Sequence, residues 1–495
     1  MERCGELTVK SDGSRRRAAK HPRSREVCRR ASVRDADQIK SGSITITDAG
    51  VNPLTDLFES AARVISEGAS PPDREDVCGL IESLGYGQAD ANARRHQASL
   101  LRAAAKLKRL FQLRAPDAPG LVFFGGEADP SILGEKLSEH PVVGLAGSGL
   151  SLPKAFESCV GEGIEYLSQF DADGSSVETA TVSQHDCVLD PVSRNFLATM
   201  LGHVGIAPDA ELAWISVVRV RDGERVRLPV DICLRRTTDS RNFVAPFKLG
   251  TGCAAGASFE NAALRALLEL IERDAAGLWW RGGTRGRQIS AGSEAGRSAS
   301  DLIERLRQGN DSRMSWLLDI TTDIGVPCAA AISSARDGYG FACGLAARTT
   351  MTEAVRAAIF EMCQSELAYA VVDAKRREAG EAGLNEADLR HLTRRTAINT
   401  RTCELLHPEG APNSGIERAE QEPERSLRAI VERVKAVGSE TFAVDLTRPT
   451  FGIPVMRILT PGLQLEPSEI VTERLARALG ETGGGKVHTG GVALL

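Results

Sequence analysis

The chain has 495 residues, of which 42% are hydrophobic and 26% are charged, and its formal net charge is -5. This length is enough for one large domain or for two to three ordinary ones, with the composition of a soluble globular protein. The negative net charge argues against a general nucleic-acid binder. The sequence also contains no apolar run that approaches a membrane span or a signal-peptide core.

The eleven cysteines are scattered along the chain and form no CxxC pair. Most of them lie in apolar runs, where a free cysteine behaves as a small hydrophobic side chain. This distribution favours a reducing, cytoplasmic setting over a disulfide framework or a zinc site.

Two regions precede the part of the chain that carries the main motifs. Residues 1–43 are basic and polar without apolar periodicity, which predicts a disordered tail, with an arm for nucleic acid or an acidic partner as the alternative. Residues 44–119 have helical spacing, with helices expected from Pro53, over Asp76–Leu84 and over Ala93–Leu113. We interpret this second region as a helical cap, and recognition of a peptide or partner is the alternative.

From residue 120 to residue 495 the pattern changes to strands mixed with helices, which predicts an α+β domain with helices packed on a mixed or antiparallel sheet. The expected strands are Leu121–Phe124, Val142–Leu145, Ala213–Arg219, Leu228–Leu234, Trp316–Ile320, Cys328–Ile332, Phe341–Leu345, Phe442–Leu446 and Ile453–Leu459. The charged stretch 376–424 is interpreted as a surface excursion. Residues 483–486 lack the GxxxxGK[ST] pattern of a phosphate loop, so we interpret them as a flexible tail or a late-ordering segment of the active site.

The stretch Gly250–Trp280 holds the strongest functional pattern. Small residues open it, Ser258 is a suitable N-cap, and a helix with one apolar stripe is expected to follow. Glu269 and Glu272 are three residues apart and therefore share one face of this helix. Two like charges beside an apolar stripe suggest a site that a cation neutralises.

Two further segments repeat this layout. Gly144–Phe170 has glycines followed by a helix that carries Glu162 and Glu165, and a later helix places Glu361 and Gln364 after a glycine-containing strand. Three segments with the same layout suggest one shared site. Because Mg²⁺ is held by a few carboxylates together with substrate phosphates, the pattern favours a magnesium–polyphosphate site.

The motifs GxxAGxSxExAxxxALLELIERDA, AxxSxxGExxE and EAxxxAxxExxQ resemble those of the YcaO family, in the family's order, from about Val142 to Leu465. The resemblance implies that residues 120–495 form a YcaO-like ATP-binding domain. It further implies Mg-ATP-dependent activation, by O-phosphorylation, of backbone amides in a ribosomally made peptide or protein.

The run EMCQSELAYAVVDAKR most resembles members that work beside a TfuA partner, a pairing linked to thioamide formation. The chain also lacks the PxPxP-like ending of azoline-forming members, so we expect a thioamide product. An azoline-forming cyclodehydratase and a non-catalytic scaffold that binds a precursor peptide are the alternatives. No nucleic-acid or membrane partner is expected, and a homodimer stays open.

The resemblance assigns roles to individual residues. It makes Glu162, Glu165, Glu269 and Glu272 ligands of Mg²⁺, with Ser258, Arg273, Glu361 and Gln364 binding the nucleotide and Arg273 and Arg457 acting in catalysis. The alternatives are solvated charges on helix faces for the glutamates and an i, i+4 salt bridge to Glu269 for Arg273. For Arg457 the alternative is a solvent-facing position on an edge strand.

Four positions depart from the commoner pattern of the family. Ser148 stands where a lysine is frequent, Ala257 replaces an asparagine, and Asn261 replaces an acidic residue. Ala357 stands where an arginine is expected, with Arg356 beside it. These changes affect the expected ribose and phosphate contacts and leave the carboxylate framework in place.

Overall fold

The computed structural model describes residues 53–67, 74–171, 177–183, 189–410 and 423–494. The contacts divide the chain at Ala49, and every described residue belongs to the unit that begins at Gly50. The predicted tail, residues 1–43, lies outside the described residues. Within the described ranges, no helix is long and apolar enough to cross a membrane.

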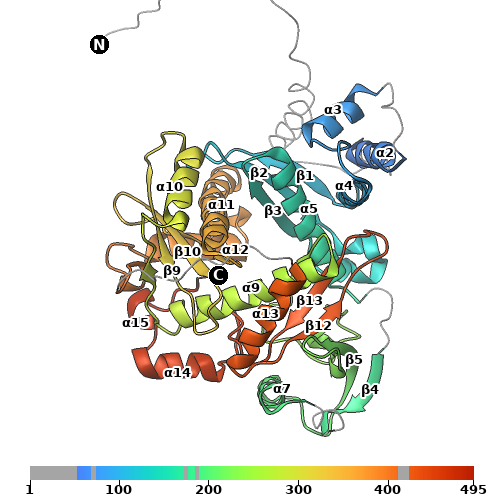
Figure 1. The fold of residues 1–495 in the computed structure, drawn as a ribbon, viewed down its shortest axis with the longest axis vertical. Coiled ribbons are helices and arrows are strands. Elements are labelled where there is room, and N and C mark those ends of the chain that lie inside the picture. The colour runs from blue at the N-terminus through green and yellow to red at the C-terminus, as the bar shows by residue number, and fades with distance from the viewer. Residues whose placement is uncertain (1–52, 68–73, 172–176, 184–188, 411–422, 495) are drawn as a thin grey trace, which may run out of the picture. The chain divides into compact units, whose positions relative to one another are not determined.

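The first elements are the helices α2 (Pro53–Glu67), α3 (Glu75–Ser83) and α4 (Ala91–Ala104) (Figure 1). The predicted helix over residues 93–113 is therefore too long, because residues 109–113 form strand β1 instead. Leu107 and Phe111 continue the apolar spacing of α4, but the backbone beyond Ala104 pairs with a neighbouring strand. Tertiary pairing outweighs the helical pattern here.

A three-stranded antiparallel sheet follows, in the order β1 (Arg109–Leu113), β2 (Val122–Ala128) and β3 (Val143–Gly149). Helix α5 (Leu152–Ser168) packs on β2 and β3. Gly147 makes this packing close, because a Cβ at that position would collide with the backbone of Ala155 and Cys159. Glycine thus brings α5 directly onto the strand.

A four-stranded antiparallel sheet has the order β11 (Ala342–Ala347), β10 (Cys328–Ala335), β9 (Arg313–Asp319) and β8 (Arg287–Gln288). Helix α11 (Met351–Ala379) packs on β10 and β11, and α10 (Glu294–Arg307) packs beside α11. Gly344 repeats the arrangement of the first sheet, since a Cβ there would meet the backbone of Ala358 and Met362.

The third sheet is six-stranded and joins strands distant in sequence. Its order is β4 (Val177–Thr181), β5 (Glu211–Arg219), β12 (Phe442–Asp445), β13 (Val455–Leu459) and β7 (Cys253–Ala255), with β6 (Arg225–Pro229) also paired to β5. The predicted strand over residues 228–234 is mostly wrong. The ladder ends at Pro229, which has no N–H to donate, and the short helix α8 (Val230–Cys233) follows.

Helix α9 (Phe259–Trp280) connects the sheets, because it contacts β7 and β13 on one side and β11 on the other. In Figure 1 it crosses the centre of the view between α11 and β13. The predicted N-cap is confirmed, since the Ser258 side chain accepts a hydrogen bond from the backbone of Asn261 at 3.2 Å. The described chain thus has the predicted α+β architecture, with a helical region before it.

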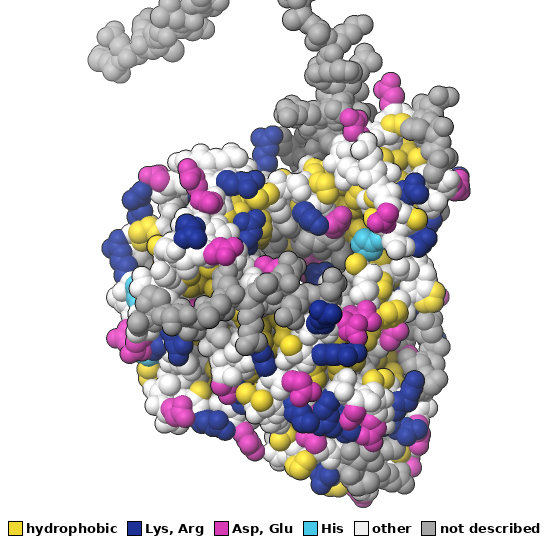
Figure 2. All heavy atoms as spheres, in the orientation of Figure 1, with side chains coloured by type: hydrophobic (Ala, Val, Ile, Leu, Met, Phe, Trp, Pro, Cys, Tyr) yellow, Lys and Arg dark blue, Asp and Glu magenta, His cyan; other side chains and the backbone are white. Residues whose placement is uncertain are grey.

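The remaining elements cover these layers. They are η1 (Pro130–Leu133), η2 (Glu135–Glu139), α7 (Pro191–His203), η3 (Glu381–Gly383), α12 (Glu386–Ala397), η4 (Glu404–Leu406), α13 (Pro423–Ala436), α14 (Glu473–Thr482) and α15 (Lys486–Thr489). On the face shown in Figure 2, Lys and Arg side chains are interspersed with Asp and Glu across the described surface.

Residues 483–486 do not form the predicted flexible tail, because Gly485 N donates a hydrogen bond of 2.8 Å to the carbonyl of Arg281 and Lys486 begins α15. The alternative, a late-ordering segment of the active site, stays a prediction. The residues that follow are packed as well. Trp280 Nε1 donates a hydrogen bond of 2.6 Å to the carbonyl of Val492, and Leu494 is buried in the main core. Within the predicted excursion 376–424, α12 and the buried pair Leu405 and Leu406 are ordered parts of the structure, and residues 411–422 lie outside the described ranges.

Candidate functional site

Five glutamates on three helices are held by backbone N–H groups of strands β3, β7 and β11 and of the loop before β7. The hydrogen bonds are Ala146 N to Glu162 Oε2 (2.5 Å), Ala255 N to Glu165 Oε1 (2.8 Å), Gly252 N to Glu269 Oε2 (3.0 Å), Ala347 N to Glu272 Oε2 (3.3 Å) and Leu345 N to Glu361 Oε2 (2.8 Å). Hydrogen bonding to backbone donors fixes the orientation of each carboxylate before any ligand arrives.

The local architecture explains how these contacts arise. In both β3–α5 and β11–α11 the glutamate lies 16 residues after its backbone donor. In both units a glycine beside the donor, Gly147 or Gly344, lets the helix backbone approach the strand. The repeated layout predicted from the sequence is therefore a repeated strand–turn–helix unit in the structure.

The first glutamate pair lies in an environment that opposes ionisation. Burial raises the pKa of Glu162 and of Glu165 to about 7, and the negative charge of Glu269 raises the pKa of both further. Glu162 still has solvent-accessible surface, so surrounding protein atoms desolvate it without closing it off from a ligand.

Glu272 and Glu361 both lie near the cation of Arg273. Burial raises the pKa of Glu272 and of Glu361, and the charge of Arg273 opposes this rise. Arg273 Nη2 lies 3.5 Å from Glu269 Oε1 and 3.6 Å from Glu272 Oε1. Among the residues that the structure describes, Arg273 Nε has no hydrogen-bond partner. The proposed salt bridge to Glu269 is thus present and leaves donor capacity on the guanidinium.

The other side chains predicted to contact the nucleotide, Gln364 and Ser258, make hydrogen bonds within the protein. Gln364 Nε2 donates to Ser148 Oγ at 2.7 Å, which connects α11 to β3 across the site. The Ser258 hydroxyl accepts its N-cap hydrogen bond and lies at the start of α9. Arg356, the neighbour of Ala357, points away from the glutamates and donates to Ser298 Oγ on α10 at 3.2 Å.

The alternative position for Arg457, facing solvent on an edge strand, is wrong. Strand β13 lies between β12 and β7, and Arg457 is 1% exposed. Its guanidinium donates to the carbonyl of Leu249, at the start of the loop whose Gly252 N–H binds Glu269. Its Nε has no partner among the described residues. Arg457 is therefore placed to position this loop.

Two arginines that the sequence patterns did not single out also border the glutamates. Arg265, one helical turn before Glu269 on α9, lowers the pKa of Glu165 and donates to the carbonyl of Ala255 at 2.9 Å. Arg348 follows β11, and its charge lowers the pKa of both Glu272 and Glu361. The i, i+4 spacing to Glu269 was the available signal for Arg265, whereas nothing local marked Arg348.

A family model described as YcaO cyclodehydratase, ATP- and Mg²⁺-binding, matches residues 146–464. The chain belongs to the YcaO family. This match covers the units β3–α5, β7–α9 and β11–α11, so all five glutamates lie within the YcaO domain. The YcaO domain binds ATP and Mg²⁺, which confirms both predicted cofactors.

Similar proteins support the YcaO fold. An uncharacterized protein of Methanothermobacter thermautotrophicus is 27% identical over 348 residues, 68% of this chain and 84% of its own. A heterocyclase in complex with substrate and cofactor has a TM-score of 0.59 at 20% identity, covering 76% of this chain and 53% of the heterocyclase. YcaO from Methanopyrus kandleri, bound with AMPPCP and Mg²⁺, has a TM-score of 0.50 at 19% identity, covering 72% of this chain and 86% of its own.

The E. coli microcin synthetase McbBCD complex with bound pro-MccB17 contains a chain with a TM-score of 0.53 at 13% identity, covering 71% of this chain and 87% of that one. At these identities the solved structures establish a common fold. This chain spans about half the length of the heterocyclase, so activity, substrate and partners are not transferred with the fold.

The donor set of the site fits the YcaO cofactors. Several desolvated carboxylates face few cations, and carboxylate oxygen is the ligand that Mg²⁺ prefers. Within the described ranges, no group of three or more His, Cys, Asp or Glu side chains is arranged to hold a metal ion. Mg²⁺ is usually held by a few carboxylates together with substrate phosphates, and the glutamates on α5, α9 and α11 can supply those carboxylates.

Proposed function

We propose that this protein is a Mg-ATP-dependent enzyme that activates backbone amides of a ribosomally made peptide or protein by O-phosphorylation. The supporting observation is a set of five backbone-held glutamates in which burial and the charge of Glu269 raise the pKa of the other four, with Arg273 beside Glu269 and Glu272. Strongly perturbed carboxyl groups gathered at one place are typical of functional sites.

The proposed roles follow from position. Glu162, Glu165, Glu269 and Glu272 would hold Mg²⁺, and Glu361, Gln364 and Ser258 would border the nucleotide. When bound, Mg-ATP supplies the phosphoryl group that converts an amide oxygen into a leaving group. The free Nε of Arg273 would donate to a phosphate oxygen, with its guanidinium oriented by the two flanking carboxylates.

Arg457 has a different proposed role from the other site residues. It is 1% exposed, forms no ion pair with a glutamate among the described residues, and donates to the carbonyl of Leu249. We assign it to positioning the loop 249–252, from which Gly252 binds Glu269. Replacing it with lysine would keep the charge but lose the planar fork of donors.

For the product we propose a thioamide, formed with a TfuA-like partner that delivers sulfur. The run from Glu361 to Arg376 on α11, which resembles that of TfuA-associated members, supports this choice. Azoline formation is the second candidate, favoured by the likeness to heterocyclases. The two products differ chemically, because one exchanges oxygen for sulfur and the other loses water from a Cys, Ser or Thr residue.

ATP turnover stimulated by a peptide tests the proposal. The full chain, with and without a TfuA-like protein, is screened against a peptide library for release of inorganic phosphate, with Glu269→Gln as the matched variant. For a stimulating peptide, a heavy-oxygen label on the amide carbonyl should appear in the released phosphate, and mass spectrometry of the peptide should identify the product. Intact turnover in Glu269→Gln, or label retained in the peptide, would contradict amide activation at this site.

A scaffold without catalysis predicts a different result in the same assay. Peptide would then bind without stimulating ATP turnover, whatever partner is present. The departures Ala257 and Ala357 are the residues that favour this alternative, whereas the intact glutamate framework opposes it.

A further inference from the structure

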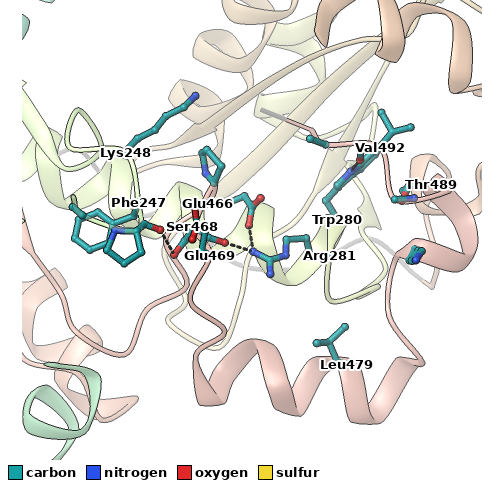
Figure 3. A pocket seen from close by; sticks show the side chains of 16 residues that line it. Phe247, Lys248, Trp280, Arg281, Glu466, Ser468, Glu469, Leu479, Thr489 and Val492 are labelled. Carbon is teal, nitrogen blue, oxygen red and sulfur yellow. Dashed lines mark hydrogen bonds and ion pairs between the residues drawn. The ribbon is translucent and has the colours of Figure 1, made fainter. Parts of the chain in front are cut away.

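A cavity of about 660 Å³ lies at the carboxyl-terminal end of α9 (Figure 3). Its walls are residues 245–248, Trp280 with Arg281, residues 466–469, Leu479, Lys486, Thr489 and residues 491–493. A volume in this range is typical of sites that bind small molecules or short peptide segments. None of the five glutamates lines it.

The cavity is nevertheless close to the glutamate site. Trp280 follows Arg273 by seven residues on α9, which is a rise of about 10 Å along the helix. The loop that carries Lys248 also reaches Gly252, whose N–H binds Glu269 at 3.0 Å. Arg273 and Glu466 both influence the charge state of Lys248. A ligand in this cavity would therefore lie close to the glutamates, where we propose that the phosphoryl group is transferred.

The acidic side chains of the cavity are already paired. Arg281 Nη1 lies 2.9 Å from Glu466 Oε2 and also donates to the carbonyl of Ser468 at 2.9 Å. Glu469 Oε2 lies 2.8 Å from His203 Nε2, a hydrogen bond that becomes an ion pair when the imidazole is protonated. Figure 3 shows Arg281 directed at Glu466 and Ser468, while Lys248 extends away from them.

The uncommitted charge of the cavity is positive. In the described part of the chain, neither Lys248 nor Lys486 makes a hydrogen bond or an ion pair, and both are exposed. Although part of Lys248 is exposed, partial burial of its side chain lowers its pKa, and the nearby charges of Arg273, Arg390 and Arg394 lower the pKa further. An incoming anion would relieve this repulsion, so the cavity is electrostatically complementary to a carboxylate.

The apolar wall is held in place before a ligand binds. Trp280 stacks on Phe341 with ring centroids 5.6 Å apart, and its Nε1 donates to Val492 at 2.6 Å. Phe247 is 8% exposed and belongs to the main core. A fixed aromatic wall beside two free ammonium groups suits an apolar side chain next to a carboxylate.

We propose that this cavity is the acceptor-peptide site, and that it binds a peptide segment in which an apolar side chain lies beside a carboxylate that pairs with Lys248 or Lys486. This rests on the proposed amide activation. The carboxylate belongs either to an Asp or Glu side chain or to the carboxyl terminus of the peptide. Because an extended chain advances about 3.3 Å per residue, the rise of about 10 Å from Arg273 to Trp280 corresponds to about three residues of extended peptide between the glutamate site and the aromatic wall.

Binding of three acetylated peptides to the full chain tests the site. The probes are Gly-Phe-Gly-Asp amide, the neutral Gly-Phe-Gly-Asn amide, and Gly-Phe-Gly-Gly with a free carboxyl terminus, each titrated calorimetrically with Mg²⁺ and a non-hydrolysable ATP analogue present. We expect at least one acidic probe to bind about tenfold or more tightly than the neutral probe, as for a charge-assisted contact. The acidic probe that binds identifies the source of the carboxylate.

Matched variants locate the effect. Lys248→Gln/Lys486→Gln should remove the preference for the acidic probe, whereas Lys435→Gln, at an exposed position on α13, should retain it. The proposal is overturned if neither acidic probe binds, if the neutral probe binds equally well, or if the double variant keeps the preference.

Titration of the same double variant with ATP separates this proposal from the proposed function. A tenfold loss of ATP affinity would assign the cavity to the nucleotide and overturn the peptide site, while amide activation would stand. Lysine-dependent binding of an acidic probe, without ATP turnover on any peptide, would leave the peptide site standing and contradict amide activation.

Discussion

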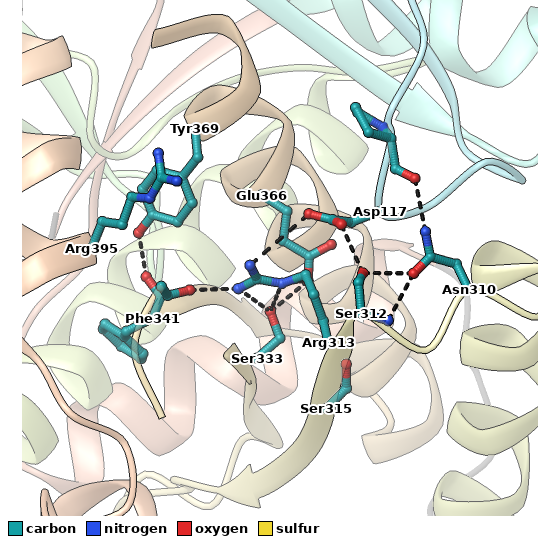
Figure 4. Close-up of polar contacts among 12 residues, drawn as sticks. Asp117, Asn310, Ser312, Arg313, Ser315, Ser333, Phe341, Glu366, Tyr369 and Arg395 are labelled. Atoms are coloured by element: carbon teal, nitrogen blue, oxygen red, sulfur yellow. Dashed lines mark hydrogen bonds and ion pairs between the residues drawn. The ribbon is translucent and has the colours of Figure 1, made fainter. Parts of the chain in front are cut away.

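Helix α11 carries two glutamates that are five residues apart and have opposite surroundings. Glu366 accepts hydrogen bonds from Arg307 Nη1 at 2.6 Å and Nη2 at 2.7 Å, and Arg313 Nε lies 3.1 Å from it. Figure 4 shows Arg313 between Glu366 and Ser333. Glu361 accepts one backbone hydrogen bond, and burial raises its pKa.

We infer that this difference separates a structural carboxylate, Glu366, from a functional one, Glu361. Glu366 is compensated by two guanidinium groups, so its charge is satisfied without any ligand. Glu361 and the glutamates around it share few cations and oppose one another's ionisation. We infer that the unbalanced negative charge at Glu361 is what Mg-ATP binding neutralises, and that the cluster around Glu366 holds α11 in place.

The largest effect on stability is expected at Glu366. Glu366→Gln leaves Arg307 buried without an ion-pair partner and Arg313 with only Asp117 at 4.0 Å, which should lower the free energy of unfolding by about 3–5 kcal/mol. Glu361→Gln on the same helix removes an unbalanced charge, so it should change stability by less than about 1 kcal/mol. Urea denaturation without nucleotide measures the free energy of unfolding of both variants. Equal losses in the two variants would contradict the distinction between Glu366 and Glu361.

The stability of the fold should depend on pH through the buried carboxyl groups of Glu162 and Glu165. Glu162 and Glu165 have pKa values raised to about 7 from an ordinary value of 4.5, so between these values the folded state binds more protons than the unfolded state. Their contribution therefore falls as the pH rises from about 4.5 to about 7.

Glu162→Gln/Glu165→Gln isolates this contribution. Both proteins are measured without Mg²⁺ and ATP. The free energy of unfolding of the variant minus that of the wild type should be more positive at about pH 8 than at about pH 5.5. Denaturation of both proteins at the two pH values gives the difference. A stability difference that does not change with pH would show that these carboxylates are not destabilised by burial.

A smaller effect is expected where the two strand–turn–helix units meet. Gln364→Ala removes the 2.7 Å hydrogen bond to Ser148, which should cost about 1 kcal/mol of stability or less and raise the KM for ATP a few-fold. Ser148→Ala is the matched variant, and steady-state kinetics compares them. If Gln364 acts only through Ser148, the two effects should be alike, whereas a larger effect of Gln364→Ala would show direct contact with the nucleotide.

Much of the site was predictable because its signals are local. The spacing of Glu269 and Glu272, the N-cap at Ser258 and the repeated glycine–helix layout each lie within one segment of the sequence. Strand β1 was not predictable from such signals, since Leu107 and Phe111 continue the helical spacing while the chain pairs with β2.

The interactions that distinguish the two kinds of glutamate depend on the folded chain. Arg307 and Glu366 are 59 residues apart, and nothing near either residue marks them as partners. The backbone donors of the glutamates, the position of Arg348 and the free charge of Lys248 likewise depend on how sheets and helices meet. Sequence patterns identified the carboxylates, and only the tertiary contacts separate Glu361 from Glu366.

The most direct test of the account is calorimetric titration of the full chain with ATP, with and without Mg²⁺, alongside Glu269→Ala/Glu272→Ala. A matched control is Asp301→Ala/Glu304→Ala, which removes two exposed acids with the same spacing on α10. The account predicts binding that requires Mg²⁺, is lost in the first double variant and is retained in the control. ATP binding that persists without Mg²⁺ or in Glu269→Ala/Glu272→Ala would contradict it.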